Sequence, residues 1–154
     1  MTRSIEPWVA GPLHDFVTES SARLTLLMTG SGQVIAQHGF PGALDVMSAA
    51  ALGAGIMASS QEIAALMRWP PFRVMVHQGP HRGHFLAAFE LPRGRCIGLV
   101  VFGTETNLGL VQLFFDQMVE ELMAAAPQQE APRLVLAANF ETELNASLRA
   151  LFTR

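Results

Sequence analysis

The sequence predicts a single α+β domain in which helices cover an antiparallel β-sheet. Its 154 residues, half of them apolar, are enough for one hydrophobic core and leave little room for a second. Short apolar segments alternate with turns of a few residues rich in glycine and proline, and strands joined in this way run antiparallel to their neighbours. Other segments carry apolar residues at helical spacing. The predicted order is α-β-β-α-β-β-β-α with five strands, followed by a short C-terminal helix.

The N-terminal segment is predicted to form an amphipathic helix followed by a hairpin. Apolar residues recur at helical spacing within Ile5–Ser21, but Gly11-Pro12 interrupts the pattern, so we expect the helix to begin at the proline. Two strands are predicted at Arg23–Thr29 and Gln33–His38. The glycines of Gly30–Gly32 between them favour a tight turn.

The central helix is predicted at Asp45–Met67. The Asp45 carboxylate can accept hydrogen bonds from the free amides of the first turn, so we expect it to be the N-cap. Pro70-Pro71 prevents the helix from continuing. Within residues 46–67 the only charged residue is Glu62, and alanine and methionine dominate. A helix with so few polar residues must be covered on more than one side.

Two glycines inside this helix require a physical reason, because each costs up to about 1 kcal/mol relative to alanine. Close approach of another backbone would supply one. The flat seam would consist of Gly53, Ala54, Gly55 and Ala58. It could face the protein's own sheet or a second helix, and the residues alone favour neither. The aromatic Trp69 just beyond the helix is either a lid over its end or an interface anchor.

The second half of the domain is predicted to contain three strands and a helix. The strands are Phe72–Gln78, His84–Leu91 and Arg95–Phe102. The last of these is the most continuously apolar, which predicts a central position in the sheet. Apolar residues at helical spacing then predict a helix at Leu108–Ala125.

The C-terminal residues are predicted to lie outside this domain. We divide the chain into a domain at 1–126, a linker at 127–138 and an amphipathic helix at 139–154. A helix this short is marginal alone and needs a groove. It could pack on its own domain or dock on a partner as a tethered recognition helix. Its apolar stripe consists of Phe140, Leu144, Leu148, Leu151 and Phe152.

Composition excludes several functions. The net charge of -3 argues against non-specific nucleic-acid binding, and the apolar content argues against disorder. The single cysteine, Cys96, cannot form an internal disulfide and lies in an apolar strand, where we expect an unreactive thiol. We find no apolar run long enough for a membrane helix and no signal-peptide pattern, so we expect a cytoplasmic protein without membrane insertion.

No residue pattern indicates catalysis. The histidines His77, His81 and His84 flank a predicted turn, without a cysteine or carboxylate at ligand spacing, so we interpret them as solvent-exposed and not as a metal site. A nucleophile elbow and a phosphate-binding loop are both missing. We therefore predict a binding protein that is not an enzyme, with no catalytic residues, metal or cofactor.

Several segments resemble the roadblock/light-chain domain family, and within it the bacterial MglB-type regulators of a Ras-like small GTPase. The similarity covers about residues 12–125. The chain departs from the family at Arg68–Pro71, where a glycine-containing loop is usual. The matching features are the hairpin LLMTGSGQVIAQHG, the helix positions Asp45, Leu52, Ala54, Gly55, Ala58, Ile63 and Leu66, then Phe72, then VHQG at His77 and Gly79, and VVFGTETNLGLVQL at Val100–Leu113.

The resemblance implies a five-stranded sheet with the Asp45 helix on one face and the first and third helices on the other. It also implies a two-fold homodimer in which the strand beginning near Phe72 pairs with its copy, which removes an exposed sheet edge. The two Asp45–Met67 helices would then lie side by side. The implied dimer interface comprises Gly53, Ala54, Gly55, Ala58, Phe72, Val74 and Val76.

The implied function is regulation of a small GTPase of the MglA type. By resemblance, the dimer would bind the GTP-loaded form and stimulate hydrolysis by ordering the GTPase's own switch loops, without donating an arginine finger, in cell polarity or motility control, with a cell pole as one expected place of concentration. A non-catalytic scaffold and a longin- or profilin-like ligand sensor are the alternatives. The expected partner-binding residues are Ser48, Ala51, Ser59, Glu62, Arg68, Trp69, Phe140, Leu144, Leu148 and Leu151.

Overall fold

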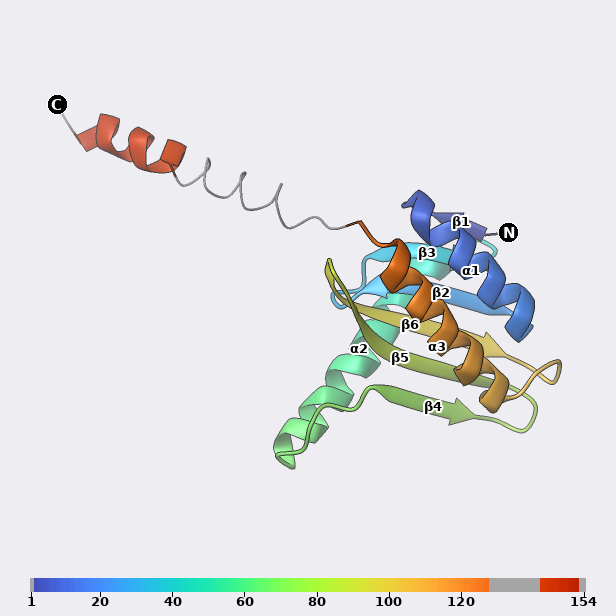
Figure 1. Ribbon diagram of the computed structural model, residues 1–154. Coiled ribbons are helices and arrows are strands. Elements are labelled where there is room, and N and C mark those ends of the chain that lie inside the picture. Colours follow the sequence, from blue (N-terminus) through green and yellow to red (C-terminus); the bar gives the residue numbers. More distant parts are fainter. Residues whose placement is uncertain (1, 128–141, 153–154) are drawn as a thin grey trace.

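A computed structural model describes residues 2–127 and 142–152, and its described part is an α+β sandwich (Figure 1). One antiparallel sheet of six strands, in the order β1-β3-β2-β6-β5-β4, separates α2 on one face from α1 and α3 on the other. The predicted fold class and the predicted placement of the helices are confirmed. The elements are β1 (Thr2–Ser4), α1 (Pro7–Ser20), β2 (Leu24–Thr29), β3 (Val34–His38), α2 (Ala43–Leu66), β4 (Val74–Gln78), β5 (Gly83–Leu91), β6 (Gly94–Phe102) and α3 (Leu108–Ala125).

The N-terminus differs from the prediction in two ways. Thr2–Ser4 forms a sixth strand, which pairs with β3 and becomes one edge of the sheet. Three residues are too few to show an alternating pattern, so the prediction of five strands was wrong. Moreover, α1 begins at Pro7 and continues through Pro12. Pro12 lies near the start of the helix, where its missing N–H removes a single backbone bond, to the Trp8 carbonyl, without ending the helix.

The core on the α1 and α3 face is centred on Phe115. Its ring makes edge contacts with Phe16, Phe85 and Phe89, with ring centroids 6.0, 5.1 and 5.8 Å away. Gly98 of β6 provides the space, because a Cβ there would lie 2.5 Å from the Phe115 ring. As predicted, β6 is central, lying between β2 and β5.

The core on the opposite face is thinner and lies under α2. Met28, Leu86 and Ile97 of the sheet are each at most 1% exposed beneath this helix. This face holds the longest helix of the described residues, and much of that helix is left uncovered.

Candidate protein-binding surface

The ends of α2 are fixed by backbone geometry more than by the residues we expected. Gly42, in an extended conformation, is the N-cap, and Asp45 lies within the first turn. The prediction of Asp45 as the N-cap was therefore wrong, although its charge still favours the positive end of the helix dipole. At the other end Arg68 has a φ of 57°, and the Trp69 amide donates to the Ala64 carbonyl over 2.9 Å. This closure is of the Schellman type, with arginine in the left-handed position that glycine usually takes.

One side of α2 packs on the protein's own sheet. Gly53 is buried, and a Cβ at this position would lie 3.1 Å from Cε of Met28. Ala54 is half-buried beside Gly32 of the β2–β3 hairpin. Gly53 thus permits close packing within the chain, and its predicted place in a seam between two copies was wrong. Gly55 is different, because a Cβ there would have no atom within 4 Å.

The opposite side of α2 is apolar and uncovered. Leu52 is 69% exposed, Ile63 56% and Leu66 82%. A groove of about 710 Å³ runs between this side of the helix and strands β4 and β5. Monomeric proteins rarely leave contiguous apolar surface of this kind in water, so it indicates a binding surface. The groove is lined by Ala51, Leu52, Gly55, Ile56, Ser59, Ser60, Ile63, Met75, His77 and His84.

The length and composition of α2 would allow it to cross a membrane, which we had expected of no segment. Residues 45–66 are long and apolar enough to cross a membrane, with a mean hydropathy of 1.2. That expectation was wrong as far as length and composition go. One such helix is weak evidence for a membrane span, however, and this one has a buried side that packs on the sheet. Its apolar character is also what a covered protein interface requires.

The groove adjoins the free edge of the sheet. In the described chain β4 pairs only with β5, so its other edge offers unpaired backbone groups. Val74 is 47% exposed at this edge, whereas Val76 is half-buried and packs on the Phe115 side of the sheet. Between α2 and β4, the rings of Trp69 and Phe72 meet edge to face at 6.3 Å, and both are exposed.

The expected partner-binding residues of the domain are all on the surface. Arg68 and Trp69 are exposed at the end of α2, and Ser59 lines the groove. Ser48, Ala51 and Glu62 are also exposed, and so is Ala58 of the expected dimer interface. What sequence reasoning missed was the apolar stripe Leu52, Ile56, Ile63 and Leu66. Its spacing of four, seven and three residues places it along one side of a helix, and this spacing could have revealed it.

The C-terminal helix leaves its apolar residues uncovered. Residues 142–152 are helical and all exposed, including Leu144, Leu148 and Leu151 at 47%, 44% and 75%. In this structure the helix is therefore not covered by its own domain. Phe140 and most of the predicted linker lie outside the described residues.

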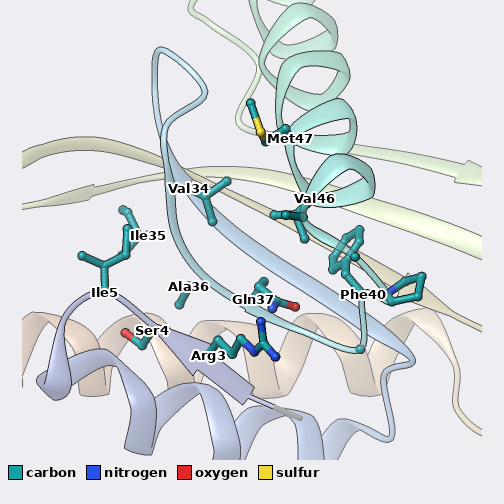
Figure 2. Close-up of a pocket in the computed structure, with 14 residues that line it drawn as sticks. Arg3, Ser4, Ile5, Val34, Ile35, Ala36, Gln37, Phe40, Val46 and Met47 are labelled. Carbon is teal, nitrogen blue, oxygen red and sulfur yellow. The ribbon is translucent and has the colours of Figure 1, made fainter.

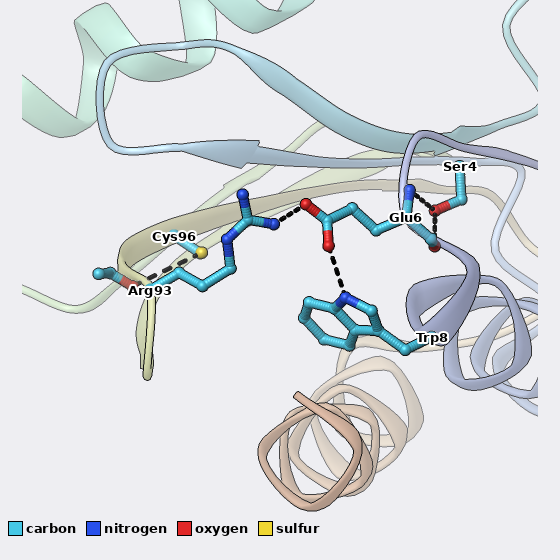
Figure 3. Close-up of polar contacts among 6 residues, drawn as sticks. Ser4, Glu6, Trp8, Arg93 and Cys96 are labelled. Atoms are coloured by element: carbon cyan, nitrogen blue, oxygen red, sulfur yellow. Dashed lines mark hydrogen bonds and ion pairs between the residues drawn. The ribbon is translucent and has the colours of Figure 1, made fainter. Parts of the chain in front are cut away.

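Two other hollows do not have the character of a catalytic site. One, of about 460 Å³, lies where β1 and β3 approach the start of α2, and mostly apolar side chains such as Val34 and Val46 surround it (Figure 2). The second hollow is lined in part by Glu6, Trp8 and Arg93. Glu6 forms an ion pair with Arg93 and accepts a 2.6 Å hydrogen bond from Nε1 of Trp8 (Figure 3). These contacts tie the start of α1 to the β5–β6 turn, which is a structural role.

The reactive groups also give no indication of catalysis. Burial raises the pKa of the Cys96 thiol to about 11, so it is a neutral, packed side chain at physiological pH. Within residues 2–127 and 142–152 no three histidine, cysteine or acidic side chains are placed to hold a metal ion. The ligand-sensor alternative needs converging polar groups, yet the polar side chains of the α2 groove are two serines and two histidines.

Solved structures share this architecture. MglB of Myxococcus xanthus has 24% sequence identity and a TM-score of 0.68, over 78% of this chain and 95% of that one. The gliding protein MglB of Thermus thermophilus has 27% identity and a TM-score of 0.67, over 77% and 88%. A roadblock/LC7 domain from Streptomyces avermitilis has 15% identity and a TM-score of 0.62, over 71% and 89%. No family model matches the chain, and no curated protein matches it.

The sandwich therefore has a roadblock-type fold. Within that class the chain resembles the MglB-type proteins, as the sequence motifs had indicated.

Proposed function

We propose that this protein is a homodimeric regulator of a Ras-like small GTPase of the MglA type. It binds the GTP-loaded form and stimulates hydrolysis by ordering the switch loops of the GTPase. The observation that carries the proposal is the uncovered apolar side of α2, continuous with the free edge of β4. Binding through this surface would be its means of action. We place its action in the cytoplasm, in polarity or motility control, concentrated at a cell pole.

The homodimer is supported by two adjacent unsatisfied surfaces. Pairing β4 with its copy would satisfy the backbone groups at the sheet edge. The same two-fold operation would bring the α2 helices together over the joined sheet, with Leu52, Gly55 and Ile63 between them and Gly53 turned inward. A solved MglB with 26% identity to this chain is described as having a tetrameric arrangement, which supports assembly of this type of domain.

The outer side of the α2 pair would then be available to the GTPase. Glu62 is exposed on α2, and Arg68 and Trp69 are exposed at its end. Phosphoryl transfer depends on positioning and electrostatics, so holding the switch loops can raise the rate without a donated side chain. Arg68 is an exposed arginine near this surface, and its removal provides a test, because an arginine finger contributes roughly 10³- to 10⁵-fold to the rate.

The test is single-turnover phosphate release from a purified MglA-type GTPase of the same genome, with and without this protein. We expect faster release with the wild type, and also with Arg68→Ala at a loss below about tenfold, since no finger is removed. Ile63→Glu, which charges the apolar side of α2, should abolish stimulation. Glu19→Gln on the exposed side of α1 is the matched control. A loss of a thousandfold or more with Arg68→Ala would refute the loop-ordering mechanism.

A non-catalytic scaffold is the second candidate, because the same apolar surface can tether a GTPase without changing its rate. Binding of the GTPase loaded with a GTP analogue or with GDP, measured by calorimetry, separates the two functions. Preference for the GTP-analogue form together with an unchanged hydrolysis rate would establish the scaffold. A variant truncated after residue 126 tests the C-terminal helix as a second contact, which is rejected if affinity and turnover are unaffected.

A further inference from the structure

Two histidines lie together in the wall of the α2 groove. His77 of β4 and His84 of β5 are directly opposite each other across the antiparallel pair. Their rings stack, with centroids 4.7 Å apart and planes inclined by 28°. Both side chains point to the α2 side of the sheet, because both line the groove together with Ser59 and Ser60.

Among the residues that the structure describes, no acidic side chain lines this groove to compensate a positive charge on either ring. A charged imidazole is costly to cover unless it has a partner, and two charged imidazoles this close would also repel each other. The elements around the groove carry other charged and titratable residues close in sequence to its lining, but none of these lines the groove. They are Glu62 of α2, Arg73 before β4, His81 and Arg82 of the β4–β5 turn, and Arg95 of β6. Of these, Arg95 has its guanidinium directed to Gln61 of α2.

The environment of His84 already disfavours its charged form. Burial lowers the pKa of His84 below its ordinary value of 6.5, and the neighbouring His77 lowers it further. Above the ordinary pKa the ring is neutral whether it is covered or free, so no cost arises there. As the pH falls through that value, the less covered state takes up the proton more readily, and the cost of covering the ring therefore appears on the acid side.

We propose that the stacked pair His77 and His84 makes the joining of two copies sensitive to acid, because a second α2 helix can cover the groove only when the pair is uncharged. This inference rests on the proposed homodimer. It assigns the pair a regulatory role in assembly: the dimer is favoured at neutral pH, and protonation of the pair opens it.

The dimer dissociation constant, measured by sedimentation of the full-length protein between about pH 5.5 and 7.5, tests the inference. Dissociation takes up at least one proton for each copy, and each proton changes the constant by up to about tenfold per pH unit. We expect the dimer to dissociate at least about tenfold more readily at the acid end. Circular dichroism at each pH shows that the subunit remains folded.

Variants separate the pair from other titrating groups. The double variant His77→Gln and His84→Gln should remove most of the pH dependence, whereas His81→Gln, in the exposed turn outside the groove, should retain it. The His84 ring, followed by NMR in the wild type, should titrate at lower pH in concentrated than in dilute protein. If the double variant fails to dimerise, the titration of His84 in the wild type still tests the inference.

Four results would overturn the inference. A dissociation constant that is flat with pH would overturn it and leave the homodimer standing, as would an unchanged pH dependence in the double variant or an NMR midpoint independent of concentration. A protein that is monomeric at neutral pH at every concentration would overturn both this inference and the proposed homodimer.

Discussion

The substitution Gly55→Ala separates folding of the subunit from joining of two copies. In the single subunit the added methyl group would have no atom within 4 Å, so it creates no clash. Alanine in place of glycine in a helix interior stabilises by up to about 1 kcal/mol. The subunit alone should therefore be more stable than the wild type.

The dimer should respond in the opposite direction. If the α2 helices meet over Gly55, both copies insert a methyl group into the contact, and such overpacking costs roughly 1–3 kcal/mol. Because about 1.4 kcal/mol corresponds to tenfold in an equilibrium constant, dimerisation should weaken by about five- to 150-fold. Sedimentation equilibrium over a dilution series measures this constant. Urea denaturation at low protein concentration, where dimer is scarce, measures the stability of the subunit.

Gly11→Ala is the matched control for this experiment. Gly11 is also a helical glycine with nothing within 4 Å of an added Cβ, but it belongs to α1 on the other face of the sheet. It should raise the stability of the subunit by a similar amount and leave dimerisation unchanged. If Gly55→Ala dimerises as tightly as Gly11→Ala, the helices do not meet at Gly55 and the reasoning about the seam is wrong.

Three further predictions concern the domain itself. Gly98→Ala should lower the free energy of unfolding by roughly 1–3 kcal/mol in urea denaturation, because the new Cβ would displace the packed ring of Phe115, and an unchanged value would contradict this packing. Alkylation of Cys96 at about pH 8 should be far slower than that of a free thiol, since a pKa of about 11 leaves roughly one thiolate in a thousand. Arg23 lowers the pKa of Glu105, so any stabilisation by the pair is present above the ordinary glutamate pKa and is lost as the pH falls through the lowered one. Because both side chains are exposed, Glu105→Gln should leave the melting temperature unchanged near neutral pH.

Sequence patterns predicted the elements whose limits are set locally. The helix Leu108–Ala125 was predicted from its apolar spacing with its observed bounds, and in the structure Asn107 caps it by accepting from the Leu110 amide. The β2–β3 hairpin followed from its glycine turn. Two features depend on context that one segment does not contain. Thr2–Ser4 becomes a strand only because β3 offers a free edge, and Arg68 takes a left-handed conformation only because it closes α2.

The side of α2 that forms the candidate binding surface also could not be predicted from the sequence alone. Sequence alone indicates that a helix of alanine, methionine and glycine must be covered, but it does not say which side its own sheet covers. The structure separates the two glycines that the sequence pairs: Gly53 is pressed against Met28, and Gly55 faces open space. Since both carry the same cost in a helix interior, intrachain packing explains only the first. In the proposed homodimer the second copy would lie over Gly55, on the side of α2 where Leu52 and Ile63 are exposed.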